Sequence, residues 1–368
     1  MKYIYKKKIY ILMFTILDAI GRVLLYPLRM FAKDDSVCPK SIIVIRGDHI
    51  GDVVASSVVL GPLREAFPKA KIDMMVPSGT ADVFKENPYL DNTILFDPPW
   101  FDRQKSGIGG YIKGLIRMKR LLKSGNYDVA IGLRGDSRHI FAMFLGGIKH
   151  RISYGITGGG FLLSQEVSYQ TKMHETDRNM ALLEPLGIKR KASDVCLNFS
   201  KKDREEATCL MKDCDIAEKY AILHVVPGHC TKLWSPDKFA RVAEYVRQEK
   251  RLIPIIIGAS ADTCKIAEII KCSKVKIVDI SGKTRLGLLG PILENANLFV
   301  GLDSGPSHIA SAVGVPVVIL FSGVNDPDEW APRGRNVSVV YPGQGENLSV
   351  VTPEEVCRAV DEALEKQS

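Results

Sequence analysis

The sequence predicts a doubly wound α/β protein with two domains, each built around a parallel sheet. Short runs of β-branched and other apolar residues recur along the chain, and segments with helical apolar spacing separate them. This alternation is typical of parallel sheets that helices cover on both faces. The chain has 368 residues, which is more than one hydrophobic core usually serves. We therefore expect two domains of similar size.

The clearest strand–turn–helix unit covers residues 41–67. Ile42–Ile45 has the composition of a strand buried on both faces, and apolar positions recur at helical spacing over Val53–Phe67. The turn between them carries Asp48, Asp52 and two glycines. Ligands of doubly wound sheets bind at the carboxyl edge where such turns lie, so Asp52 is a candidate catalytic carboxylate. The alternative is that Asp52 only caps the helix.

The rest of the first half continues the strand pattern. Residues 71–76, 93–96 and 127–133 are the next predicted strands. Arg134 directly follows the last of them, where an arginine could hold an anionic acceptor, although an exposed arginine is more often only solvated. Residues 151–160 are rich in glycine and predict a loop.

Residues 1–33 differ from everything that follows. Lys6–Lys8 precede an apolar run, which Asp18, Arg22 and Arg29 interrupt, so no uninterrupted span of ~20 apolar residues exists. At 100° per residue the polar side chains form one narrow stripe on an otherwise apolar helix. Such a helix suits the interface of a membrane that carries anionic lipid. The alternatives are a signal-like segment and a helix packed against its own protein.

The second half opens with a buried strand followed by a turn that suits a phosphate. The strand is predicted at Tyr220–Val226, and a proline-glycine turn with Lys232 precedes a helix that starts near Pro236. Backbone N–H groups and an ammonium can converge on a phosphate in such a turn. We place the boundary between the domains in the polar stretch Lys189–Lys202.

A second anion site is expected where the strand that ends at Gly301 meets a helix that starts near Pro306. The N–H groups of the first helical turn and the positive end of the helix dipole favour an anion. The polar side chains within reach are Ser304, Ser307 and His308. The alternatives are that Asp303 only caps the helix and that His308 is an ordinary packed residue.

Composition and motifs exclude several classes of function. The net charge of +8 indicates anionic partners such as phosphorylated sugars, nucleotides or acidic lipid, but no arginine-rich tract or zinc-finger spacing indicates nucleic acid. No GxGxxG motif follows a strand, which argues against a nicotinamide enzyme. Eight scattered cysteines indicate reduced thiols in a cytosolic setting. The Asp-x-Asp at Asp326–Asp328 is too weak a match to predict a metal ion.

Two separated stretches resemble the hallmark segments of the heptosyltransferase family of glycosyltransferases, family 9. They are residues 45–53 with 64–68, and residues 303–310 with 314–316. Lesser landmarks resemble those of the family in the same order: His174–Glu175, residues 182–187, Pro227–Gly228 with Lys232 and Trp234, residues 281–284, and residues 330–332. The similarity covers roughly Ile42 to the C-terminus.

The resemblance implies the GT-B architecture, in which two Rossmann-like domains face each other across a cleft. We accordingly expect an amphipathic membrane-associating segment at 1–38, an acceptor domain at 39–195 and a nucleotide-sugar domain at 196–368. The family inverts the anomeric centre without a metal ion, and no cofactor is implied. The expected donor is a nucleotide-diphosphate sugar similar to ADP-heptose, and the expected acceptor is a lipopolysaccharide core or a related envelope glycan.

The resemblance also assigns roles by position. Asp52 would be the general base, and Lys232 would neutralise the diphosphate. The segment that cradles the diphosphate would be Asp303, Ser304, Gly305, Pro306, Ser307 and His308. The acceptor would be bound by Asp48, His49, Arg134 and His174. Serines often stand where this chain has Asp48–His49, so whether Asp48 or Asp52 is the base stays open.

The expected site of action is the cytoplasmic face of the bacterial inner membrane, with the protein bound peripherally. The alternative function from another class is a sugar-nucleotide-binding scaffold of envelope assembly that has no transfer activity. A GT-B-like sugar-nucleotide epimerase is a lesser alternative within enzymes. Consumption of an acceptor distinguishes the transferase from both.

Overall fold

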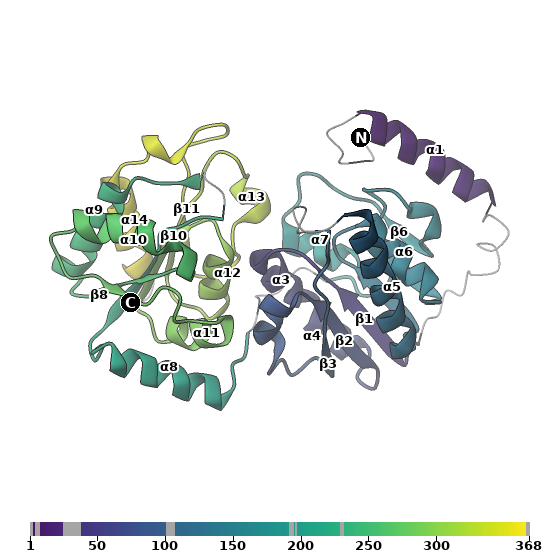
Figure 1. Ribbon diagram of the computed structural model, residues 1–368, viewed down its shortest axis with the longest axis horizontal. Coiled ribbons are helices and arrows are strands. Elements are labelled where there is room, and N and C mark those ends of the chain that lie inside the picture. Colours follow the sequence, from purple (N-terminus) through teal and green to yellow (C-terminus); the bar gives the residue numbers. More distant parts are fainter. Residues whose placement is uncertain are drawn as a thin grey trace. The chain divides into compact units, whose positions relative to one another are not determined.

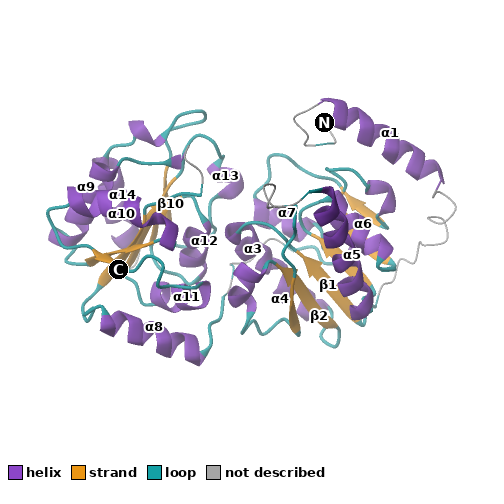
Figure 2. Cartoon of the chain, viewed as in Figure 1, coloured by secondary structure: helices purple, strands orange, loops and turns teal. Residues whose placement is uncertain are grey.

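A computed structural model describes residues 3, 8–24, 38–100, 107–190, 195, 197–228 and 232–365 (Figure 1). Contacts within the chain divide it into two compact units. The first unit comprises Met1–Asp48, Ser56–Ala81 and Asn87–Ser193, and the second comprises His49–Ala55, Asp82–Glu86 and Asp194–Ser368. Each unit holds a six-stranded parallel sheet with helices packed around it (Figure 2). This architecture confirms the predicted α/β class.

The sheet of the first unit has the strand order β3-β2-β1-β4-β5-β6. Its strands are β1 (Ser41–Ile45), β2 (Lys71–Val76), β3 (Asn92–Leu95), β4 (Val129–Gly132), β5 (His150–Tyr154) and β6 (Gln165–Val167). β1 is central, and its residues Ile42–Ile45 are at most 1% exposed, as the apolar run predicted. Ile45 pairs with Met75 on one side and Gly132 on the other, so the turns after these strands share one edge.

Helices α3 (Ile50–Ser56) and α4 (Leu60–Ala66) follow β1. The prediction of a single helix over Val53–Phe67 is wrong in its start and in its continuity. The helical segment starts earlier, at Ile50, and a 3₁₀ turn at Ser57–Val59 divides it. Pro62 explains the division, because proline cannot donate the hydrogen bond that would join the first turn of α4 to the preceding helix. Residues 50–55 of α3 belong to the second unit, although they follow β1 in the chain. Besides α4, the helices of the first unit are α1 (Lys8–Leu24), α5 (Ile108–Gly125), α6 (Ser137–Leu145) and α7 (Glu175–Ala181).

The loop predicted at residues 151–160 is also wrong in its first part. Residues up to Tyr154 belong to β5, which lies between β4 and β6. Ile152 and Tyr154 are buried, and the hydroxyl of Ser153 donates to the carbonyl of Gly132 at 2.6 Å. The strand therefore forms because tertiary pairing and burial outweigh the glycines that follow it.

The sheet of the second unit has the order β12-β11-β10-β7-β8-β9. Its strands are β7 (Tyr220–His224), β8 (Ile253–Ile257), β9 (Val278–Asp279), β10 (Leu298–Leu302), β11 (Val317–Leu320) and β12 (Val337–Val340). Its helices are α8 (Lys201–Asp213), α9 (Pro236–Gln248), α10 (Thr263–Cys272), α11 (Leu286–Glu294), α12 (Gly305–Ala312), α13 (Pro327–Trp330) and α14 (Pro353–Glu365). Gly301 of β10 pairs with His224 of β7, so the turns after both strands meet at one edge.

Candidate active site

The turn after β1 begins with a buried arginine. Arg46 is 2% exposed and organises the carboxyl edge of the first sheet. Its Nε donates to Asp48 Oδ1 at 2.6 Å, and its Nη1 donates to Glu175 Oε1 at 2.7 Å and to Asn179 Oδ1 at 3.3 Å. Arg178, which is 1% exposed, holds the other Glu175 oxygen at 2.9 Å. The two arginines and two carboxylates thus form a buried network that joins the β1 turn to helix α7.

His174 lies at the start of that helix. It is the N-cap of α7, where its Nδ1 accepts from the backbone N–H of Thr176 at 3.2 Å and lies 2.8 Å from the Thr176 hydroxyl. His174, a predicted acceptor-binding residue, therefore uses its Nδ1 to cap α7. It directly precedes Glu175, which belongs to the buried network of Arg46 and Arg178.

The two carboxylates of the β1 turn lie in different surroundings. The Asp48 side chain is 5% exposed, with Arg46 on Oδ1 and Arg134 Nη1 3.5 Å from Oδ2. Oδ1 is therefore hydrogen-bonded to the buried Arg46, and Oδ2 has only the longer charge contact with Arg134. Asp52 is half-buried and lies in the first turn of α3, inside the helix and not at the position that precedes it. His49, between them, is exposed.

The turn after β4 adds a second group of charges at this edge. Gly135 has φ +72, and Asp136 then caps α6 by accepting from the backbone N–H of Arg138 at 2.9 Å. Burial alone would raise the pKa of Asp136, but the nearby His139 and the Arg138 guanidinium bring the pKa down to about 2. The Arg138 guanidinium also stacks 4.8 Å from the centre of the Trp100 ring. Asp136 is thus a permanent anion that fixes this turn.

His139 lies beneath the same edge. It is 1% exposed, neither ring nitrogen has a hydrogen-bond partner among the described residues, and its ring packs 5.9 Å from that of Trp100. Burial lowers the pKa of His139, so the imidazole is neutral at physiological pH. A Cβ at residue 47 would lie 3.3 Å from the His139 imidazole. Because Gly47 has no side chain, the β1 turn can pass close to this ring.

In the second unit, the predicted phosphate-binding lysine contacts the predicted anion cradle directly. Lys232 Nζ forms an ion pair with Asp303 Oδ2, and Asn325 Nδ2 donates to the same oxygen at 2.8 Å. The Asp303 side chain is 8% exposed. Asp303 therefore sets the position of the lysine ammonium at the end of β10. Residues 229–231 of the same predicted turn lie outside the described residues.

Helix α12 starts next to this pair. Ser304 is its N-cap residue, but its side chain makes no capping hydrogen bond. The hydroxyl donates instead to the carbonyl of Leu302 at 3.0 Å and lies 3.0 Å from His224 Nδ1. Ser307 donates from its hydroxyl to the carbonyl of Ser304 at 2.6 Å. Because the Ser304 side chain does not cap its own helix, the N-terminus of α12 keeps the character of an anion site.

His224 holds the serine from below. Burial lowers its pKa to about 4, so the ring is neutral, and because Ser304 donates elsewhere the Nδ1–H is the donor between them. A side chain at Gly301 would come within 2.9 Å of the His224 Cβ. The glycine of β10 therefore leaves room for the histidine of the neighbouring strand.

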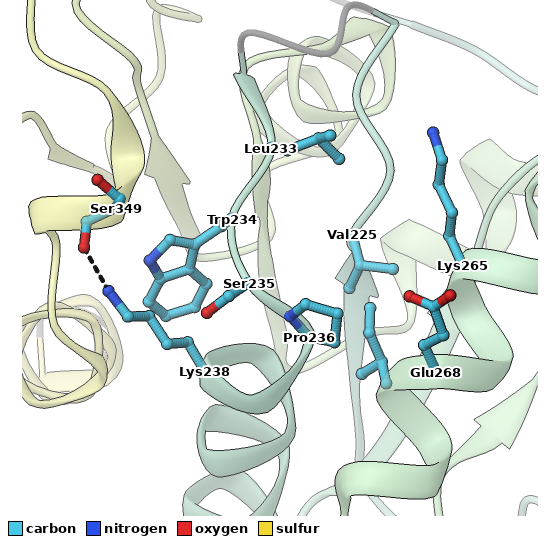
Figure 3. Close-up of a pocket in the computed structure, with 10 residues that line it drawn as sticks. Val225, Leu233, Trp234, Ser235, Pro236, Lys238, Lys265, Glu268 and Ser349 are labelled. Carbon is cyan, nitrogen blue, oxygen red and sulfur yellow. Dashed lines mark hydrogen bonds between the residues drawn. The ribbon is translucent and has the colours of Figure 1, made fainter.

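A pocket of about 590 Å³ lies beside the Lys232 turn in the second unit (Figure 3). Its walls are mostly apolar, and its Lys238 ammonium donates to the carbonyls of Ser349 at 2.6 Å and Val351 at 2.7 Å. The pocket is lined by Val225, Leu233, Trp234, Ser235, Pro236, Lys238, Lys265, Glu268, Ile269 and Ser349. None of the predicted donor-binding residues lines it, so the anion site and this pocket are separate features.

Asp326 and Asp328 do not converge as metal ligands. Asp326 caps α13 by accepting from the backbone N–H of Asp328 at 3.0 Å. The Asp-x-Asp pattern is therefore a helix start. Over the part of the chain that the structure describes, no three His, Cys, Asp or Glu side chains are grouped as metal ligands would be.

Several residues of these two edges escaped the sequence interpretation. They are Arg46, Glu175, Arg178 and Asn179 in the first unit, and His224 and Asn325 in the second. Two of them carried a usable signal, because Arg46 directly follows β1 and His224 ends β7. Glu175 belongs to the landmark His174–Glu175, which gave it no role, and no local pattern indicates Arg178, Asn179 or Asn325.

The chain contains two parallel sheets of the doubly wound kind, and this is the architecture of the GT-B class of nucleotide-sugar enzymes. The chain belongs to glycosyltransferase family 9 (heptosyltransferase), whose sequence model matches residues 115–355. It is therefore a glycosyltransferase. This finding confirms the resemblance carried by the two hallmark segments.

The relatives agree in sequence and in fold. Lipopolysaccharide heptosyltransferase 3 of Escherichia coli K12 is 28% identical over 340 residues, which cover 85% of this chain and 95% of the relative. A family 9 glycosyl transferase from Veillonella parvula superposes with a TM-score of 0.79 at 22% identity, over 90% of this chain and 100% of that structure. The structure of E. coli ADP-heptose LPS heptosyltransferase II superposes with a TM-score of 0.75 at 19% identity, over 89% of this chain and 99% of that structure.

Proposed function

We propose that this glycosyltransferase moves heptose from ADP-heptose to a lipopolysaccharide core, with inversion at the anomeric carbon and without a metal ion. The relatives support the substrates, since one is named as a lipopolysaccharide heptosyltransferase and a similar structure as an ADP-heptose enzyme. We further propose that the first unit binds the acceptor and the second binds the donor. The roles of single residues follow from their surroundings.

Asp52 is the general base, and the observation that carries this role is the contrast with Asp48. Asp48 Oδ1 accepts from the Nε of the buried Arg46 at 2.6 Å, and Arg134 Nη1 lies 3.5 Å from Oδ2, so Asp48 is tied into the buried charge network. Asp52 is half-buried at the start of α3, on the turn that follows the central strand. A carboxylate on a short rigid element can accept a proton from a bound hydroxyl.

The acceptor lies against the edge that Arg46 organises. Asp48 fixes the Arg134 guanidinium, which is 36% exposed and can bind an anionic group of the acceptor. The exposed His49 and the helix cap His174 complete this side. Asp48 is therefore a positioning residue, and Arg134 is the residue that contacts the acceptor.

The diphosphate lies against Lys232 and the start of α12. The Lys232 ammonium already sits at the carboxyl edge, held by Asp303. Ser304 is the N-cap residue of α12, and Gly305, Pro306, Ser307 and His308 form its first turn. Pro306 has no N–H and the Ser307 N–H donates to the Ser304 carbonyl at 3.2 Å, so the site relies on the Gly305 N–H and the positive end of the helix dipole. These groups stabilise negative charge that grows on the leaving group.

The transfer then balances in one displacement. The acceptor hydroxyl loses its proton to the Asp52 carboxylate as its oxygen bonds to the anomeric carbon. The bond between that carbon and the diphosphate oxygen breaks, and the nucleoside diphosphate leaves with the electron pair. General-base assistance of this kind contributes typically ~10²–10⁴-fold to the rate.

The place of action follows from the acceptor. Among the described residues, no helix combines the length and the apolar character that crossing a membrane requires. We propose that the protein binds peripherally to the cytoplasmic face of the inner membrane, where a lipid-linked acceptor is within reach.

The test uses purified full-length protein, ADP-heptose and a deacylated lipopolysaccharide core acceptor, with product detected by mass spectrometry. We expect Asp52→Asn to bind ADP normally and to lose about 10²-fold or more in kcat. The matched variant is Asp48→Asn, which removes one charge from the same turn and is expected to raise the acceptor KM more than it lowers kcat. The product's anomeric configuration by NMR and assays with EDTA test inversion and metal independence.

Each outcome separates a different part of the proposal. Near-normal kcat in Asp52→Asn, with a collapse in Asp48→Asn, would assign the base to Asp48. ADP-heptose binding without turnover on any core acceptor would favour the scaffold alternative. Turnover of another nucleotide sugar in preference to ADP-heptose would keep the mechanism and correct the donor.

A further inference from the structure

Helix α1 packs on the first unit through its polar side. Asp18 is 2% exposed and accepts from the backbone N–H of Gly159 at 2.8 Å and from the Tyr3 hydroxyl at 2.9 Å. One turn further on, Arg22 forms an ion pair with Glu166. Asp18 and Arg22 of the predicted polar stripe thus contact protein, whereas Lys8 and Thr15 of the same stripe are exposed.

The docking is close as well as polar. A side chain on Gly21 would come within 2.4 Å of the Phe161 ring, and a Cβ at Gly158 would come within 2.1 Å of the Phe14 ring. Phe14, Asp18 and Gly21 follow the i, i+4, i+7 spacing of one helix face. This face of α1 therefore fits the segment that surrounds the 3₁₀ turn η3 (Gly160–Leu162).

The opposite face of α1 is apolar and exposed. Its exposed fractions range from 41% for Met13 to 76% for Val23. The exposed apolar residues are Ile9, Leu12, Met13, Ile16, Leu17, Ile20, Val23 and Leu24. A contiguous apolar surface of this kind marks a site of interaction with a membrane or another protein.

Two helices of the same unit, α5 and α6, also expose apolar side chains, and α5 adds positive charge. α6, which also packs on η3, exposes Phe141 at 42% and Phe144 at 37%. α5 packs on α6, exposes Ile112 at 55%, and contains no acidic residue. Its basic residues are Lys113, Arg117, Lys119, Arg120 and Lys123. Apolar side chains flanked by lysine and arginine match the chemistry of an anionic lipid surface.

We propose that the apolar face of α1, with the exposed parts of α5 and α6, is a preassembled docking surface for an anionic lipid bilayer. The apolar side chains enter the boundary between headgroups and acyl chains, and the α5 cations bind the headgroups. As in a free interfacial helix, the apolar face enters the membrane, but here Asp18 and Arg22 of the polar side contact protein instead of water. The inference names the surface behind the peripheral binding in the proposed function.

The docked helix also connects to the acceptor edge. Gly159 lies two residues after Thr157, whose hydroxyl donates to the Gly135 carbonyl at 2.8 Å and accepts from the Ser137 N–H at 2.7 Å. Gly135 directly follows Arg134. The lipid-binding helix and the turn that carries Arg134 are therefore joined through one short segment of the first unit.

The test is flotation of the full-length protein with vesicles of phosphatidylethanolamine and phosphatidylglycerol, compared with phosphatidylcholine alone. We expect Ile16→Glu/Ile20→Glu to weaken partitioning about tenfold or more, because each charge enters the apolar boundary. The matched control is Thr15→Glu, which places the same charge on an exposed residue of α1 outside that face. Lys113→Glu/Arg117→Glu should abolish the preference for anionic vesicles, and Lys201→Glu, on the second unit, should not.

Activity on a deacylated, water-soluble core acceptor separates this inference from the proposed function. We expect the Ile16→Glu/Ile20→Glu variant to keep wild-type turnover there while losing vesicle binding. Equal flotation of that variant and the wild type would overturn the proposal. So would an unchanged partition together with a shift from dimer to monomer in light scattering, because a second copy of the chain would then cover the face.

Discussion

Arg46 and Asp48 form an ion pair across a single intervening glycine, with Nε and Oδ1 2.6 Å apart and side chains 3% and 5% exposed. The pair lies in the turn after the central strand, so it fixes the backbone from which α3 starts. It also separates the two carboxylates of the turn into a buried, paired one and a half-buried one. The division of roles between Asp48 and Asp52 follows from this arginine.

Arg46→Met is expected to destabilise the protein by ~3–5 kcal/mol, because removing one partner leaves buried carboxylates without compensation. The free energy of unfolding in urea measures the effect. Arg241→Met is the matched control: Arg241 pairs with Glu354, but the side chains are 60% and 61% exposed, so the expected loss is ~0–1 kcal/mol. A similar loss of unfolding free energy in both variants would mean that the Arg46 network does not stabilise the turn after β1.

Gly135→Ala should damage the acceptor edge through backbone sterics. Gly135 has φ +72, and a Cβ there would lie 2.8 Å from the carbonyl oxygen of Tyr154. Gly147 has φ +80 with nothing within 4 Å, so Gly147→Ala isolates the cost of the backbone conformation alone, which is of order 1 kcal/mol. We expect Gly135→Ala to lower the melting temperature further and to raise the acceptor KM. Equal effects would show that the Tyr154 contact relaxes freely.

His224 should make stability depend on pH. Burial lowers its pKa from 6.5 to about 4. Between pH 4 and pH 6.5 the histidine is therefore protonated in the unfolded chain but neutral in the folded chain. Its contribution is therefore complete above pH 6.5 and is lost as the pH falls, by ~2 kcal/mol at pH 5. The variant His224→Asn should flatten the slope of the unfolding free energy over this range. The exposed His49→Asn serves as the control, and a wild-type slope in both would refute the assignment.

Lys232→Met should weaken donor binding more than acceptor binding. A hydrogen bond to a charged group contributes ~1.5–3 kcal/mol, so we expect ADP affinity to fall about 10- to 100-fold in calorimetry. Lys201→Met, with a side chain 92% exposed on α8, should leave it unchanged. An unaltered ADP affinity in Lys232→Met would remove the lysine from the phosphate site.

The buried strands were the most predictable part of the fold. β2 and helix α9 have the bounds that the sequence indicated, because β-branched runs and an amphipathic helix after Ser235 are strong local signals. The edge strand β6 was missed and β9 was overestimated: β6 has three residues, none of them buried, and β9 has two. Such short edge strands depend on pairing with a neighbour and leave no apolar run in the sequence.

The site was predictable only where its residues directly follow strands. Arg134 and the segment at Asp303 could be placed at a sheet edge in this way, although their roles remain predictions. Glu175 contacts Arg46 across 129 residues, and Asn325 contacts Asp303 across 22. Ion pairs between separate elements depend on how the helices pack, which periodicity does not encode.

The bond between Asp18 and Gly159 spans 141 residues. At a synthesis rate of about 5–20 residues per second, α1 leaves the ribosome roughly 7–28 s before its docking partner exists. During that interval the polar stripe is hydrated, and the apolar face can already adsorb to lipid. Because the later docking uses the side of α1 that carries Phe14, Asp18 and Gly21 and not the exposed apolar face, the body of the enzyme folds onto a helix that need not leave the bilayer first.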